Sequence, residues 1–254
     1  MPRGAPRKRP KSTPAAHPKL APHPTVMRSS APNTKISLMD SVAVSAAGRA
    51  VADLDPAVRA FAARILGVPA EDVAPWLSDH IHPRGWAPQL RVLARAANYT
   101  TQAAIDPQPV PLKILSPVLA AASLEEESAD PGASAMERRW AALLARAAHA
   151  GGRDIPPSFP AVLRDLSYLE AEALAVIADG VADNAADGFP VGELHAVLES
   201  LVPASELGLT LALENLYRLR LARSQPAGSR IAIWPTVFGL ELARACLPPA
   251  ATLA

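Results

Sequence analysis

Cysteine, aromatic residues and long apolar runs are scarce in this chain of 254 residues. The single cysteine, Cys246, cannot form an internal disulfide, and the neighbouring Leu242 and Leu247 favour a small buried hydrophobe over a reactive thiol. Aromatic residues make up only 4% of the chain, although 50% of it is hydrophobic. A core built mainly from Ala, Leu and Val is typical of closely packed helices, so the composition predicts a mainly α fold.

Segments that would export or anchor the chain are missing as well. No run approaches the roughly 18 uncharged apolar residues that a membrane span needs. A signal peptide needs an apolar core of about 7 to 15 residues behind its basic start, and the first apolar stretch here, 36–39, is ended by Asp40. We therefore expect a cytoplasmic protein without a membrane span.

Sequence patterns for catalysis and for metal binding are also absent. The acidic stretch 179–188 fails the spacing of a calcium loop, because the third and twelfth positions counted from Asp183 are Ala185 and Leu194. His80 and His82 have no second cluster of ligands, so capping or surface roles are favoured over a zinc site. Neither a phosphate-binding glycine loop nor a strained nucleophile turn occurs. We expect no enzyme activity, cofactor or metal.

Positive charge is concentrated at the N-terminus. Residues 1–40 hold eight Lys or Arg against Asp40 alone, which leaves 17 basic and 23 acidic residues in 41–254. Prolines recur through the same segment and fix φ too often for a helix or strand to persist. We predict a disordered, basic, Pro-rich tail over 1–40. Residues 7–11 of this tail could contact phosphate, but a solvated extension is the favoured interpretation. The mildly acidic remainder should not coat nucleic acid by charge alone.

Helical periodicity predicts a helical region over 41–152. Asp55 can cap a helix that starts at Pro56 and ends at Gly67. Further helices are predicted from about 75 and, after Pro83, over 86–101. The segments 112–122 and 135–149 are predicted to form an antiparallel hairpin. Glycine and proline pairs over 151–157 then mark a domain boundary.

Residues 153–254 are predicted to form a winged-helix-like module. Helices are expected over 159–166, 168–178, 191–201 and 209–219, with a capping box of Ser167 and Glu170 opening the second and Gly180 ending it. Segments 220–223 and 231–234 flank the turn signal 226–228 and predict a two-stranded wing. Thr236 then caps a final helix that Pro248 terminates.

Winged helices usually bind a partner, so the function is expected to lie in a contact. In a DNA reader, the helix over 209–219 would enter the major groove. Its leading turns carry no Arg or Lys, which favours a winged helix that contacts protein or dimerises. Under the DNA-binding alternative, the candidate nucleic-acid contacts are Asn215, Arg218, Arg220, Arg223 and Arg230.

Several stretches, in their order and spacing, resemble the abortive-infection alpha family. These stretches are 112–126 (LKILSPVLAAASLEE), 139–145 (RWAALLA), 157–163 followed by Leu166 and Ser167, 215–219 (NLYRL), 236–239 (TVFG), and Ala245 with Cys246. The resemblance covers about residues 75–250, and the helix over 84–97 is similar to the family's basic segment. It implies a bacterial protein with a role in phage resistance, no established enzymatic activity and no assigned catalytic residues.

The chain departs from the family pattern at a few positions. Arg220 stands where the family tends to have Gly, and a non-Gly residue in a left-handed helix cap costs about 1–2 kcal/mol. We therefore expect this helix to end differently and to shift the wing. An insertion around 128–135 and the residues Pro235 and Val237 are further departures.

Taken together, the sequence predicts three parts: the disordered tail 1–40, the helical region with its hairpin 41–152, and the winged-helix-like module 153–254. We predict a non-enzymatic interaction protein in phage defence, with a host or phage protein as its partner and self-association left open. The alternative is a winged-helix transcription regulator that binds DNA.

Overall fold

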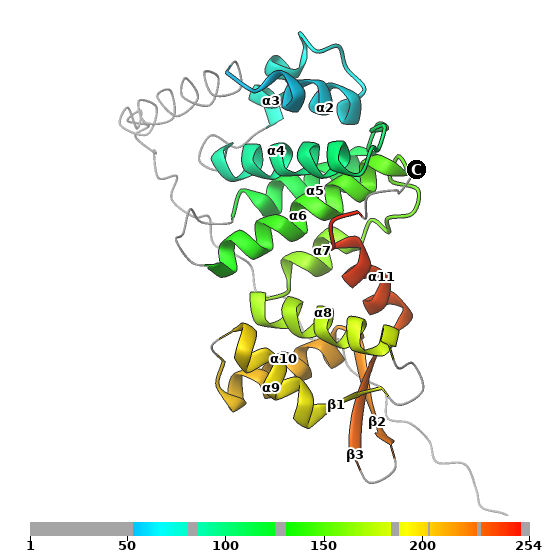
Figure 1. Cartoon of the computed structure of the whole chain (residues 1–254). Helices are drawn as coiled ribbons and strands as arrows, with labels where there is room; N and C mark the ends of the chain where they lie inside the picture. Colours follow the sequence, from blue (N-terminus) through cyan, green and yellow to red (C-terminus); the bar gives the residue numbers. More distant parts are fainter. Residues whose placement is uncertain are drawn as a thin grey trace, which may run out of the picture.

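The structure is a computed structural model that describes residues 53–80, 86–124, 131–183, 188–202, 204–227 and 230–249. Helices are stacked in layers above a small sheet at one end of the molecule (Figure 1). This confirms the predicted mainly α fold. The tail predicted over 1–40 lies outside the described residues.

The first helices follow the predicted local signals. α2 (Pro56–Leu66) begins where the Asp55 side chain accepts a 2.8 Å hydrogen bond from the Ala57 amide, and it ends at Gly67 in the left-handed conformation. α3 (Val73–His80) and α4 (Trp86–Gln102) come next. α5 (Leu112–Ala122) has the predicted bounds.

α6 (Pro131–His149) is the central helix of the molecule. Its side chains from Ala135 to Ala148 are buried, apart from three arginines. α4 and α5 pack against it from one side, and elements of the C-terminal module pack from the other (Figure 1). The predicted start at 135 is wrong by four residues, because Pro131 has the fixed φ that suits a first helical turn.

The C-terminal part is winged-helix-like. Its elements are α7 (Phe159–Arg164), α8 (Tyr168–Asp183), β1 (Phe189–Pro190), α9 (Val191–Leu201), α10 (Glu206–Arg218), β2 (Ala222–Ala227), β3 (Arg230–Pro235) and α11 (Val237–Ala245). The antiparallel sheet has the order β1-β3-β2, with Phe189 opposite Ile233 and Arg223 opposite Trp234. β1 was not predicted, since a strand of two residues carries no readable periodicity.

Several predicted boundaries in this module are wrong. α8 continues through Gly180, because the ring of Phe189 fills the space that a Cβ at residue 180 would need. Glycine therefore serves close packing at this position and does not end the helix. α10 begins three residues before 209, since the Ser205 hydroxyl accepts a 3.1 Å hydrogen bond from the Gly208 amide and caps it. α7 is two residues shorter than predicted, and β2 begins two residues later than predicted.

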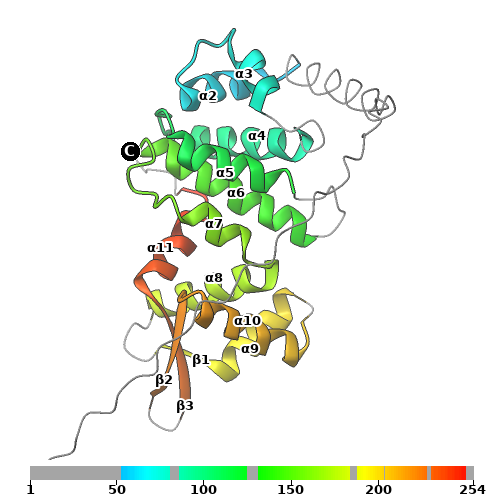
Figure 2. The same cartoon turned by 180° about the vertical axis from the view of Figure 1, so that it is seen from behind.

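The last helix returns toward the centre of the molecule. α11 packs on α8 and contacts α6, as the view from behind shows (Figure 2). The Thr236 hydroxyl accepts a 3.0 Å hydrogen bond from the Gly239 amide, which confirms the predicted cap. Buried residues on both sides of residue 152 belong to one hydrophobic cluster, and the boundary drawn there stays a prediction.

No single helix among the described residues is long and apolar enough to cross a membrane. Within the described ranges, α9 and α10 meet that test of length and composition only when taken together, and they are bent by 114° relative to each other.

Arg220 adopts the left-handed conformation that glycine favours. Its φ is 57°, and the amides of Arg220 and Leu221 donate to the carbonyls of Tyr217 and Leu216. These two bonds form the Schellman motif that normally has Gly at this position. The expectation that the helix ends differently is therefore wrong. The Thr236 hydroxyl, which donates to the Arg220 carbonyl at 2.7 Å, helps to hold the strained turn.

Replacing Arg220 with Gly should relieve this strain. We expect R220G to raise the free energy of unfolding by about 1 kcal/mol, or the melting temperature by roughly 2–4 °C. R223G is the matched control, because residue 223 lies in a strand where Gly only adds backbone entropy to the unfolded chain, and it should lower stability. Urea unfolding measures both, and a loss of stability in R220G would contradict the strain.

Candidate functional site

The outward face of α10 is the candidate functional site. Leu209, Ala212, Leu213 and Leu216 are buried toward the rest of the module. The opposite side of the helix exposes Glu206, Leu207, Thr210, Leu211 and Glu214, and we call these five residues the outward face of α10. Leu207 and Leu211, one helical turn apart, are 68% and 56% exposed.

The position of α10 within the module makes this face significant. α9 and α10 are joined by four residues and turn by 114° relative to each other, which is helix-turn-helix geometry. In that arrangement the second helix of the pair presents its outward face to DNA. Here the face carries leucines and glutamates, neither of which suits a polyanion.

Asn215, the strongest predicted base-edge contact, points into a polar network inside the module. Its Nδ2 donates a 2.6 Å hydrogen bond to Oε1 of Glu170, which is only 9% exposed. The other carboxylate oxygen of Glu170 accepts from the Ser167 amide at 2.5 Å, and the Glu170 amide donates to the Ser167 hydroxyl at 3.3 Å. This pair is the predicted capping box. The network therefore ties α10 to the first turn of α8.

Arg218 belongs to the same network. Its Nε and a terminal guanidinium nitrogen donate to Oδ1 of Asn215 at 2.8 and 2.6 Å. Two of the five candidate nucleic-acid contacts are thus bonded to each other, with Asn215 half-buried and Arg218 exposed. The sequence could not reveal this, since Glu170 lies 45 positions from Asn215.

The other three candidate contacts do not form one patch. Arg220 occupies the strained turn, and Arg223 is exposed near the start of β2. Arg230 lies at the far end of the wing, opposite Ala227, so it is about 13 Å along the strand from Arg223. Its guanidinium is 4.0 Å from the Glu193 carboxylate. The turn signal at 226–228 lies partly outside the described residues.

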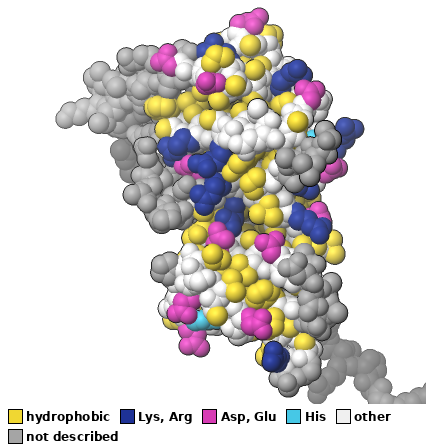
Figure 3. Space-filling view, viewed as in Figure 1, with side chains coloured by type: hydrophobic (Ala, Val, Ile, Leu, Met, Phe, Trp, Pro, Cys, Tyr) yellow, Lys and Arg dark blue, Asp and Glu magenta, His cyan; other side chains and the backbone are white. Residues whose placement is uncertain are grey.

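Basic side chains gather instead in the middle of the molecule, at the level of α4 and α6 (Figure 3). Arg91 of α4 donates to the buried Glu137 carboxylate of α6 at 2.6 and 2.9 Å. Arg139 forms a 3.0 Å ion pair with Glu172 of α8, where both side chains are less than one fifth exposed. These contacts hold helices together, so Arg91 and Arg139 have structural roles.

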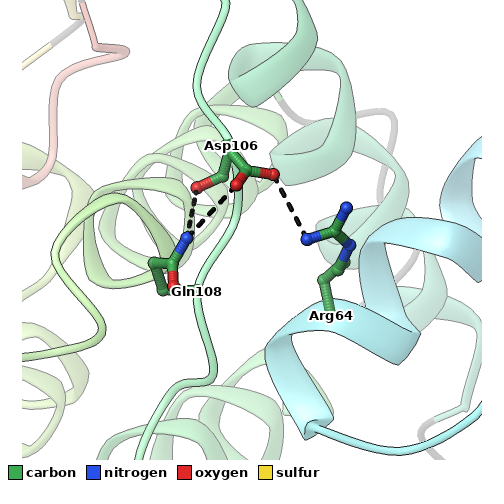
Figure 4. Close-up of polar contacts among 3 residues, drawn as sticks. All are labelled: Arg64, Asp106 and Gln108. Atoms are coloured by element: carbon green, nitrogen blue, oxygen red, sulfur yellow. Dashed lines mark hydrogen bonds and ion pairs between the residues drawn. The ribbon is translucent and has the colours of Figure 1, made fainter.

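Two surface depressions of the described structure are large enough to hold a small ligand. One, of about 520 Å³, lies between α2 and residues 107–109, where Asp106 contacts Arg64 at 3.4 Å and Gln108 at 3.3 and 3.4 Å (Figure 4). Both charged groups of the ion pair are more than 60% exposed, so it contributes little to stability. The other, of about 360 Å³, is lined by Arg146, His149, Asp154 and Glu241, and within the described residues no hydrogen bond or ion pair joins these four.

His80 and His82, for which capping or surface roles were favoured over a zinc site, are described only in part. The ring of His80 stacks on Trp76, with centroids 4.0 Å apart, and its Nδ1 is 2.8 Å from the Trp76 carbonyl at the end of α3. His82 lies outside the described residues. Among the residues that are described, no group of three or more His, Cys, Asp or Glu could hold a metal ion.

Cys246 is buried at the end of α11, as predicted. Burial raises the pKa of its thiol to about 12, against a small opposing effect of the Arg139 charge. A thiol with that pKa is almost entirely protonated at neutral pH and is a poor nucleophile.

Comparison with known proteins gives one match. The family model described as abortive infection alpha matches residues 89–246, which include all elements from α5 to α11 and most of α4. No curated protein and no solved structure matches the chain.

The structural role of Asn215 can be tested directly. We expect N215A to lower the free energy of unfolding by about 1–3 kcal/mol, because it leaves an oxygen of the buried Glu170 carboxylate without its donor. A double-mutant cycle with E170A should show a coupling above about 0.5 kcal/mol. R223A should be nearly neutral and is the matched control. An N215A variant as stable as the parent would contradict the network.

The burial of Cys246 predicts both slow labelling and a pH effect. At pH 8 a thiol reagent such as Ellman's reagent should react with the folded protein at least a hundredfold more slowly than with the protein in urea. Because the folded pKa is raised from 9.0 to about 12, the contribution of the protonated thiol to stability is complete below pH 9 and is lost as the pH rises toward 12. Equal labelling rates in the two states would refute the burial.

Proposed function

The chain belongs to the abortive infection alpha family, and on that premise we propose that it acts in phage defence as a non-enzymatic interaction protein. The partner we propose is a host or phage protein, and the contact surface we propose is the outward face of α10.

The single observation that carries this proposal is the composition of that face. Removing the exposed side chains of Leu207 and Leu211 from water lowers the free energy. The decrease is largest when a partner of matching shape covers them. Glu206 and Glu214 on the same face would repel a phosphate backbone. Protein is therefore the favoured class of partner.

The polar groups of the module also support a binding role. Asn215 donates to Glu170 and accepts from Arg218, so its side chain links α8 to α10, the helix that presents the face. The burial of Cys246 and its raised thiol pKa make it an unsuitable nucleophile. These side chains are better suited to support a rigid docking surface than to carry out a reaction.

The alternative, a winged-helix transcription regulator, is favoured by the order of helices and strands alone. It would have to contact DNA through Arg220, Arg223 and Arg230, which are spread from the end of α10 to the tip of the wing. These three arginines are the natural control for the leucines of α10.

A phage-infection assay separates the two functions. Bacteria that express the chain should show fewer plaques than cells without it, and L207S/L211S should lose at least tenfold of that protection, because the variant removes the apolar contact. Both leucines are exposed, so the variant should fold, and circular dichroism checks this.

The matched control is R223A/R230A, which should protect as well as the parent. The opposite pattern, with protection lost only in R223A/R230A and a salt-dependent shift of a DNA probe by the parent protein, would support the transcription regulator instead.

A further inference from the structure

We propose that the partner presents a basic amphipathic α-helix to the outward face of α10. This inference rests on the proposed function and adds the chemistry of the partner. It follows from the apolar spacing, the charge and the backbone of this face.

The apolar spacing matches the surface of a helix. Leu207 and Leu211 are four residues apart and lie one above the other along α10. Rows of side chains with this spacing form the ridges that interlock with the grooves of a second helix. A partner helix with apolar residues at intervals of three and four would cover both leucines.

The charge of the face requires a basic partner. Glu206 and Glu214 lie beside the leucines, and both are exposed. Arg218 is the only basic residue of α10, and its guanidinium is held by the amide oxygen of Asn215. A hydrogen bond to a neutral amide leaves the charge of Arg218 in place one turn beyond Glu214, so the face together with Arg218 carries a net charge of −1, which Lys or Arg beside the apolar row of the partner would neutralise.

The backbone of the face excludes an extended partner. The amides and carbonyls in the middle of α10 are bonded within the helix and offer no hydrogen-bonding edge. An extended segment docked there would bury its own backbone groups without partners, whereas a helix satisfies them internally.

A second copy of the chain does not complement the same face. Pairing of two copies through this face would bring the exposed Glu206 and Glu214 carboxylates of both into one interface, where like charges oppose association. The face is thus suited to a different and basic molecule.

Designed peptides test the inference on the full chain. The probe is an 18-residue Leu/Lys peptide with leucines on one helical face. The controls are a Leu/Glu peptide with the same leucine positions and a scrambled Leu/Lys peptide. Fluorescence anisotropy should show binding of the Leu/Lys peptide at least tenfold tighter than that of either control. Both L207S/L211S and the charge-neutralised variant E206Q/E214Q should weaken the binding by about tenfold or more.

Several results would overturn the inference. They are equal binding of the Leu/Lys and scrambled peptides, equal binding of the Leu/Lys peptide by the parent and by L207S/L211S, and a dimer in analytical ultracentrifugation that L207S/L211S abolishes. If L207S/L211S loses phage protection while the parent shows no preference for the Leu/Lys peptide, the proposed function holds and the helical basic partner is wrong. If the peptide binds as expected and L207S/L211S still protects, the proposed function is wrong.

Discussion

The carboxylate of Glu170 is the contact on which the C-terminal module depends. It is almost fully buried, and a buried carboxylate must be hydrogen-bonded to offset the loss of water. One of its donors is the Ser167 amide at the start of α8, and another is the Asn215 side chain near the end of α10. The same group therefore starts one helix and orients another. A rotation of α10 about its axis would remove the Asn215 donor and leave the Glu170 carboxylate partly unsatisfied. The hydrogen bond between Asn215 and Glu170 therefore favours one rotation of α10 about its axis.

This constraint decides which side chains α10 presents to solvent. With Asn215 turned inward and Arg218 bound to it, Leu207 and Leu211 face outward with Glu206 and Glu214 beside them. The exposed side of α10 thus carries apolar and acidic side chains over most of its length. A second important contact in the module is made by the Thr236 hydroxyl, which donates a hydrogen bond to the Arg220 carbonyl and accepts one from the Gly239 amide. That contact holds the strained end of α10 against the start of α11, so both ends of the wing are fixed to helices.

Local signals were predicted well wherever the physical cause is itself local. The Asp55 cap, the Ser167 and Glu170 capping box, the Thr236 cap and the bounds of α5 depend on neighbours within four residues. The end of α8 was predicted wrongly at Gly180 because glycine can either end a helix or allow close packing. Here it allows close packing against Phe189, which lies in a separate strand. The end of α10 was predicted wrongly at Arg220 for a different reason. The left-handed conformation is costly for a non-Gly residue, but contacts such as the Thr236 hydrogen bond hold Arg220 in it.

The sequence by itself determined the helical class, the order of elements, the family resemblance and the inert character of Cys246, because periodicity, capping and composition act over short stretches of chain. Only the tertiary structure decided which side chains of the candidate site are bonded within the module and which are exposed. Asn215 looks like a base reader in the sequence and is a structural donor in the fold, since its partner is brought to it across 45 residues by the packing of α8 against α10. The packing of the whole core determines which polar side chains of a helix are hydrogen-bonded inside the protein and which side chains stay exposed. No single segment determines this.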